Sequence, residues 1–99
     1  MRLIAFVSKD CEVCKKVIPV INSVCLEHEV PVLISYVENH DGLFEQYGIT
    51  GTPMYVLEGE SSEIARCSGH QSQTTFQAWL EKQGIGNEKR DRLVKVYGE

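Results

Sequence analysis

The feature that most constrains the fold of this chain is the spacing of two cysteines, Cys11 and Cys14, where one hydrophobic pattern gives way to another. Before them, Leu3–Val7 is a short apolar run with β-branched and aromatic residues, which predicts a buried strand. After them, apolar residues recur at helical spacing, at Cys14, Val17, Ile18, Ile21, Val24 and Cys25. This change of period predicts a strand that leads into a helix, with both cysteines at the start of the helix.

That position predicts unequal roles for the two thiols. Residues three apart in the first turn of a helix face each other, close enough for a disulfide. Unpaired N–H groups and the positive end of the helix dipole favour a thiolate on Cys11, and Lys9 and Lys15 add positive charge nearby. Because Cys14 begins the apolar stripe, we expect it to be buried and Cys11 to be exposed. Such a pair suits thiol–disulfide exchange, in which Cys11 attacks a substrate disulfide and Cys14 resolves the mixed disulfide.

The rest of the chain predicts a small α/β fold. Further apolar runs predict three more strands, at Val32–Val37, Met54–Leu57 and Ile64–Ser68. Helical patterns predict a short helix at Leu43–Tyr47 and an amphipathic closing helix at Gln73–Gln83. The order β-α-β-α-β-β-α, with two parallel crossovers followed by a hairpin, predicts a four-stranded mixed sheet with helices on both faces.

Three segments of the chain resemble the thioredoxin-like superfamily. Cys11-x-x-Cys14-Lys15-x-x-x-Pro19 is similar to the active-site helix of that family, including its Lys and its Pro. Two further segments are similar to the family's cis-proline segment and to the Gly loop before its last helix: Tyr47-Gly48-Ile49-x-Gly51-x-Pro53 and Ser68-Gly69-His70. The resemblance implies the thioredoxin fold. Because the chain lacks the extra N-terminal strand and helix of full thioredoxins, it also resembles the minimal glutaredoxin core.

This resemblance implies a protein disulfide oxidoreductase whose only redox group is the Cys11–Cys14 disulfide, with no other cofactor and no metal. The expected substrates are protein disulfides, and the expected electron donor is a thioredoxin-reductase-like protein or glutathione. A cis Thr52–Pro53 bond would turn the backbone of Thr52 toward Cys11, where it could pair with an extended substrate. The resemblance implies these substrate-binding residues: Thr52, Pro53, Gly69 and His70.

Several positions depart from the family pattern. Glu12-Val13 stands between the cysteines, in place of the Gly-Pro of thioredoxins or the Pro-Tyr common in glutaredoxins. The dipeptide helps to set the redox potential, so the direction of electron flow stays open. Ala5 stands where thioredoxins carry a buried Asp, so removal of a proton from Cys14 must use water, another side chain or the substrate. His70-Gln71 replaces the acidic pair with which glutaredoxins hold glutathione.

Two other functions are compatible with the sequence. Two ligand pairs at zinc-site spacing would make the chain a zinc-binding module: Cys11 with Cys14, and Cys67 with His70. Alternatively, a non-catalytic thioredoxin-like adaptor would use the same groove and the C-terminal tail for docking. We expect Cys25 and Cys67 to be structural, and His28 and His40 to be exposed.

Length and composition narrow the choice of partners. The 99 residues suffice for one domain, and their net charge of -4 would repel a phosphate backbone, which argues against nucleic acid. The longest apolar runs have about five residues, whereas roughly 20 are needed to span a bilayer, so no membrane partner is expected. The N-terminus does not resemble a signal peptide. We therefore expect a cytoplasmic monomer with a thioredoxin-like domain over residues 1–84 and a tail or helix extension over residues 85–99.

Overall fold

The computed structural model describes residues 1–86. Its four strands are β1 (Arg2–Val7), β2 (Val32–Tyr36), β3 (Met54–Glu58) and β4 (Glu63–Ser68). Its helices are α1 (Glu12–Glu27), the 3-10 helix η1 (Val37–Asn39), α2 (Leu43–Gln46) and α3 (Gln73–Lys82). The predicted order of strands and helices is confirmed, and η1 is an addition that the sequence pattern did not predict. It shortens the second strand, which ends at Tyr36 rather than at the predicted Val37.

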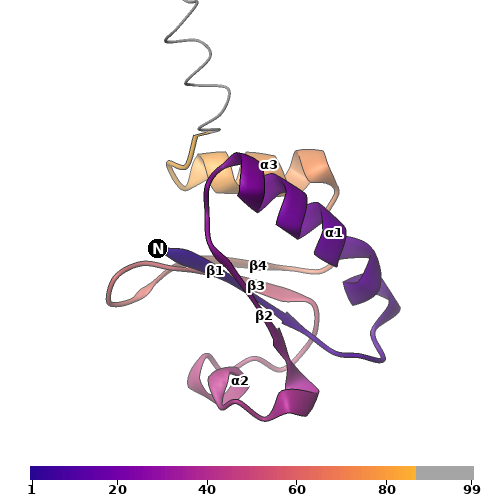
Figure 1. Cartoon of the computed structure of the whole chain (residues 1–99). Coiled ribbons are helices and arrows are strands. Elements are labelled where there is room, and N and C mark those ends of the chain that lie inside the picture. Colours follow the sequence, from indigo (N-terminus) through magenta and orange to yellow (C-terminus); the bar gives the residue numbers. More distant parts are fainter. Residues whose placement is uncertain (87–99) are drawn as a thin grey trace, which may run out of the picture.

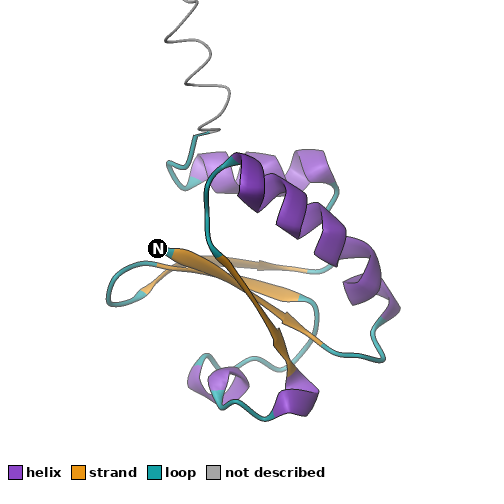
Figure 2. Cartoon of the chain, viewed as in Figure 1, coloured by secondary structure: helices purple, strands orange, loops and turns teal. Residues whose placement is uncertain are grey.

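The strands form one mixed sheet in the order β2-β1-β3-β4. Strand β1 pairs with β2 in parallel, and β3 is antiparallel to both β1 and β4. Helices α1 and α3 cover one face of this sheet, and α2 lies on the other (Figure 1). Figure 2 shows the same three layers by element type. The four-stranded sheet with helices on both faces is therefore confirmed.

This topology brings distant parts of the sequence to one end of the sheet. The register pairs Phe6 near the end of β1 with Met54 at the start of β3. Met54 in turn pairs with Ser68 at the end of β4. The segments just after β1, just before β3 and just after β4 must therefore lie near one another. These three segments carry the cysteine pair, the Thr52–Pro53 bond and the Gly69 loop.

Alternating side chains of the sheet build a hydrophobic core on each face. Leu3 and Ala5 of β1 belong to the core under α1 and α3, together with Tyr55 of β3. Ile4 and Phe6 belong to the smaller core under α2. All of these side chains are at most 1% exposed, and burial of each large apolar side chain stabilises the fold by about 1.5–3 kcal/mol. The rigid sheet that results fixes the ends of its strands.

One histidine contradicts its predicted exposure. His28 ends α1 and is 2% exposed, whereas His40 is exposed as predicted. The Nδ1 atom of His28 lies 2.9 Å from the carbonyl oxygen of Val24, and its Nε2 atom lies 3.4 Å from a carboxylate oxygen of Glu81. These polar partners offset the cost of burying the imidazole between α1 and α3, which the local sequence pattern could not show.

The core continues slightly beyond α3. Ile85 is 8% exposed and packs with the buried residues under α1 and α3. Its N–H group donates to the carbonyl oxygen of Leu80 at 3.2 Å. The remainder of the predicted tail, residues 87–99, lies outside the described residues. Within residues 1–86, no helix is both long enough and apolar enough to cross a membrane.

Candidate active site

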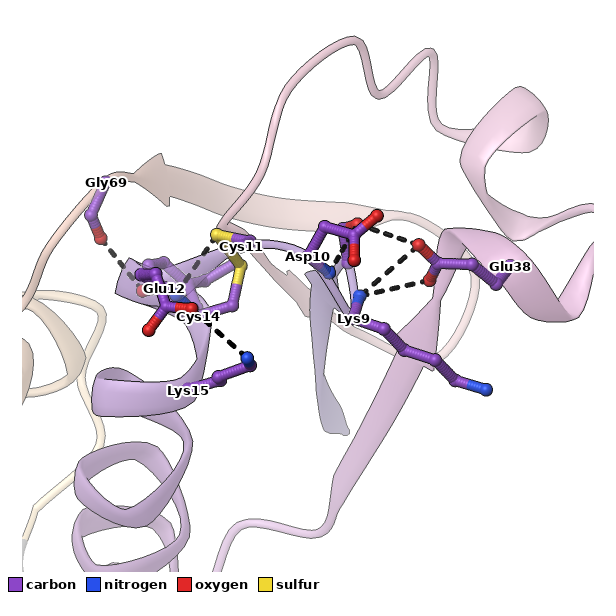
Figure 3. The surroundings of a disulfide bond; sticks show 10 residues. Lys9, Asp10, Cys11, Glu12, Cys14, Lys15, Glu38 and Gly69 are labelled. Carbon is purple, nitrogen blue, oxygen red and sulfur yellow. Dashed lines mark hydrogen bonds and ion pairs between the residues drawn. A yellow bond between two sulfur atoms is a disulfide. The ribbon is translucent and has the colours of Figure 1, made fainter.

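A disulfide joins Cys11 and Cys14 at the start of α1, with their Cα atoms 5.2 Å apart. Figure 3 shows the two sulfur atoms at the first turn of the helix. Cys14 is 1% exposed and packs inside, whereas Cys11 is only partly buried. One sulfur is therefore more accessible to a visiting molecule than the other.

Cys11 is the N-cap of α1, and its sulfur takes part in the cap. The Sγ atom of Cys11 accepts a hydrogen bond from the N–H group of Cys14 at 3.1 Å. N–H groups at the start of a helix have no partner within the helix, and they stabilise negative charge placed there. The same geometry would stabilise a thiolate on Cys11 after reduction of the disulfide, and the thiolate is the nucleophilic form of a cysteine.

Neither of the two lysines predicted to stabilise this thiolate, Lys9 and Lys15, directs its ammonium group at the Cys11 sulfur. The Nζ atom of Lys15 lies 3.2 Å from a carboxylate oxygen of Glu12. The side chain of Lys9 points away from the disulfide, as Figure 3 shows. The backbone N–H group of Lys9 donates to both carboxylate oxygens of Glu38. The N-cap hydrogen bond is thus the nearest described stabilisation of charge on the Cys11 sulfur.

The Thr52–Pro53 segment meets the Gly69 loop at the same end of the sheet. The peptide bond between Thr52 and Pro53 is cis. The N–H group of Gly69 donates to the carbonyl oxygen of Pro53 at 3.0 Å. Figure 3 shows Gly69 in the surroundings of the disulfide. Thr52 lines a small hollow together with Ser8, a residue of the turn that precedes Cys11. Thr52, Pro53 and Gly69 thus lie at the same end of the sheet as the cysteine pair.

A buried tyrosine, Tyr55, holds the Gly69 loop through a hydrogen bond. The hydroxyl group of Tyr55 donates to the carbonyl oxygen of Gly69 at 2.8 Å, the bond that ends on Gly69 in Figure 3. Burial, with a smaller contribution from Cys67, raises the pKa of Tyr55, so this hydroxyl keeps its proton. The sequence analysis did not identify Tyr55 as a site residue. Its position two residues after Pro53 on an expected strand was the available signal.

Glu38 is a second residue that the sequence analysis missed. It lies in η1, just after β2, and its carboxylate contacts Ser8 and Lys9 in the turn that leads to Cys11. Because β1 and β2 are parallel neighbours, the segments that follow them emerge side by side. That topology was the signal that could have identified Glu38.

The proposed zinc ligands do not form a site in the described structure. Among residues 1–86, no group of three or more His, Cys, Asp or Glu side chains is placed to hold a metal ion. Cys67 packs partly buried against the core under α1 and α3, and His70 is exposed after Gly69. This arrangement does not favour the zinc alternative.

Burial separates the remaining two cysteines from the reactive pair. Cys25 is 0% exposed, and Cys67 is half-buried. Burial raises the pKa of each thiol to about 12, so both remain protonated and weakly nucleophilic. Their predicted structural role agrees with this environment.

Comparisons with known proteins place this geometry in a family. A family model described as Thioredoxin matches residues 1–82. Thioredoxin 1 from the thermophilic eubacterium Thermosipho africanus TCF52B is 20% identical and aligns over 85% of this chain and 99% of its own, with a TM-score of 0.69. A mutant thioredoxin from Halobacterium salinarum NRC-1 is 22% identical and aligns over 82% of this chain and 72% of its own, with a TM-score of 0.74.

A third solved structure, described as that of a malarial protein, is 15% identical and aligns over 84% of this chain and 96% of its own, with a TM-score of 0.74. No curated protein matches the chain in sequence. At such identities the solved structures establish the shared fold, and the family model extends over most of the chain. The cysteine pair and the fold around it therefore belong to a member of the thioredoxin family.

Proposed function

We propose that this chain reduces disulfides in protein substrates through Cys11 and Cys14. Membership of the thioredoxin family and the Cys11–Cys14 pair support a thiol–disulfide oxidoreductase in general. The observation that carries the proposal is the asymmetry of the pair. A partly exposed sulfur accepts an N–H hydrogen bond at a helix start, and its partner sulfur is buried behind it.

The proposed reaction has two exchange steps that move two electrons from the chain to the substrate. The Cys11 thiolate attacks one sulfur of the substrate disulfide, forms a mixed disulfide and releases the other substrate sulfur as a thiolate, which takes up a proton. Cys14 then loses its proton and attacks the Cys11 sulfur. This second step forms the Cys11–Cys14 disulfide and releases the second substrate sulfur as a thiolate, which is also protonated. Cys14 is buried within reach of Cys11, so the second step is intramolecular.

Backbone groups beside the cysteine pair suit an extended substrate. Thr52 precedes β3 and lines the same small hollow as Ser8, which lies three residues before Cys11. We assign substrate contacts to this segment and to Gly69, which is bonded to Pro53. Exposed His70 follows Gly69 at the rim and completes the proposed groove. Pairing with a backbone would accept many sequences and would select for an unfolded or loop disulfide.

The proposal includes a donor that reduces the Cys11–Cys14 disulfide after each cycle. The candidates remain a thioredoxin-reductase-like protein and glutathione. We propose that the chain works as a monomer in the cytoplasm, where such donors keep thiols reduced. Separate assays with each donor distinguish the two.

Insulin reduction tests the proposed activity. The wild-type chain with dithiothreitol should accelerate precipitation of the insulin B chain, whereas Cys11→Ser should give only the uncatalysed rate. Cys67→Ser is the matched control, since it removes a thiol outside the pair, and it should keep the wild-type rate. Wild-type protein that does not exceed the uncatalysed rate would contradict the proposal and favour the adaptor alternative.

Trapping tests the order of attack. Cys14→Ser removes the resolving thiol, so the mixed disulfide between Cys11 and a substrate should accumulate. The double variant Cys11→Ser with Cys14→Ser should trap nothing. Insulin chains linked to the Cys14→Ser variant, detected by mass spectrometry without a reducing agent, would identify Cys11 as the attacking residue. A linkage through Cys67 instead would overturn the assignment.

A further inference from the structure

The turn that delivers Cys11 to the helix is held by its own backbone. The N–H group of Cys11 donates to the carbonyl oxygen of Ser8 at 3.2 Å. The N–H group of Asp10 is 3.4 Å from the hydroxyl oxygen of Ser8. Ser8 therefore anchors the turn from inside, and the position of the Cys11 sulfur depends on where Ser8 is held.

Glu38 holds the same turn from a different part of the chain. Its Oε2 atom accepts a hydrogen bond from the Ser8 hydroxyl at 2.8 Å. Its two carboxylate oxygens lie 3.2 and 3.3 Å from the backbone nitrogen of Lys9. Figure 3 shows the carboxylate of Glu38 facing the turn, on the side away from α1. One carboxylate thus fixes a side chain and a backbone group just before Cys11.

The carboxylate is charged when it makes these bonds. The hydrogen bond from Ser8 lowers the pKa of Glu38, and the contacts with Lys9 add to the effect. Hydrogen bonds to a charged acceptor are stronger than those between neutral groups. Glu38 sits on η1, which is attached directly to the end of β2 in the rigid sheet. The turn is therefore tied to the sheet at a point 30 residues away along the sequence.

We propose that Glu38 is a positioning residue for the redox pair. It acts through the turn Ser8–Cys11, which it keeps in the geometry that places the Cys11 sulfur beside the Cys14 N–H group and the Cys14 sulfur. A turn already fixed in this geometry raises the effective concentration of one sulfur at the other. Glu38 therefore favours the closed disulfide over the open dithiol. This inference deepens the proposed function, because it concerns the same cysteine pair.

The equilibrium between this pair and glutathione measures the effect. The full chain is equilibrated with mixtures of reduced and oxidised glutathione, quenched and alkylated, and the fraction of closed Cys11–Cys14 disulfide is determined by mass spectrometry. We expect Glu38→Ala to lower the equilibrium constant for disulfide formation by roughly three- to tenfold, since it removes the hydrogen bonds to Ser8 and Lys9. Glu38→Gln keeps an acceptor oxygen and should restore part of this loss.

Two further variants separate positioning from charge and from folding. Glu45→Gln removes an exposed carboxylate of α2 and should leave the equilibrium constant at its wild-type value. Ser8→Ala removes the hydroxyl partner, and its effect should be smaller in the Glu38→Ala background than in the wild type. Circular dichroism of each variant verifies that the fold is intact.

The outcomes of this experiment are distinct from those of the insulin assay. An unchanged equilibrium constant in folded Glu38→Ala would overturn the inference, as would an equal shift in Glu45→Gln, which would reflect net charge alone. The glutathione equilibrium needs no protein substrate. Glu38→Ala can therefore lower the equilibrium constant even if the wild-type chain does not reduce insulin. Equally, the equilibrium constant can stay unchanged in a chain that does reduce insulin.

Discussion

At the scale of single residues, burial divides four cysteines into a reactive pair and two inert thiols. Cys11 is partly exposed at a helix start, whereas Cys25 is 0% exposed within the core. Burial disfavours the charged thiolate form of a cysteine. At Cys11, by contrast, the hydrogen bond from the Cys14 N–H group would stabilise a thiolate. Burial therefore places Cys25 in a different chemical environment from Cys11.

Alkylation of the reduced native chain tests this division. At neutral pH, Cys11 should react with iodoacetamide at least about tenfold faster than Cys25 or Cys67, because only thiolates react. Burial raises the pKa of both latter thiols to about 12, so their reactivity should grow only as the pH approaches that value or the chain unfolds. Peptide mass mapping over time gives the rates, and labelling in denaturant is the control. Equal rates at Cys11 and Cys25 in the native chain would refute the assignment.

At the scale of elements, the antiparallel pair β3 and β4 carries two segments of the proposed groove, Pro53 just before β3 and Gly69 just after β4. Tyr55 on β3 makes two kinds of contact. Its ring packs against that of Phe76 on α3, with the ring centroids 5.5 Å apart, and its hydroxyl donates to the carbonyl oxygen of Gly69 after β4. Gly69 has a φ of +80°, in the left-handed region that glycine adopts without strain. The hydroxyl therefore secures a turn that few other residues could form.

The variant Tyr55→Phe separates the hydroxyl from the ring. It keeps the packing on Phe76 and should lower the free energy of unfolding by about 0.5–1.5 kcal/mol, the usual contribution of one hydrogen bond. Because the Gly69 loop loses its support, the KM for insulin should rise severalfold with little change in kcat. Chemical denaturation and steady-state kinetics measure both quantities. Tyr36→Phe, which removes a hydroxyl from β2, is the matched control; an unchanged KM in Tyr55→Phe would show that the loop needs no such support.

The elements themselves are largely predictable from local patterns, and their long-range contacts are not. The strand before Cys11 and the helix after it follow from hydrophobic period, which is a local property. By contrast, Glu38 is 30 residues from Ser8, and Glu81 is 53 residues from His28. Nothing in the sequence around His28 indicates a partner on α3, so its burial was missed. The pairing of β1 with β2 and the packing of α1 on α3 create these contacts.

At the scale of the whole molecule, the core of the described residues extends past α3 to Ile85. The core under α1 and α3 contains Ile85, whose N–H group bonds Leu80. The sequence analysis placed the end of the domain at residue 84, directly after the point where the predicted closing helix Gln73–Gln83 stops. Packing of Ile85 against the core is a tertiary contact that lies just beyond this stop.

Two truncations locate the boundary of the functional domain. A chain of residues 1–86 retains every buried residue of the described core, so it should unfold cooperatively at the wild-type midpoint and reduce insulin at the wild-type rate. A chain that ends at residue 84 loses the buried side chain of Ile85, which should cost about 1.5–3 kcal/mol of unfolding free energy. Urea titrations followed by circular dichroism compare the two with the full chain. If residues 1–86 fold but no longer reduce insulin, residues 87–99 contribute to the activity, and the redox domain does not end where its core does.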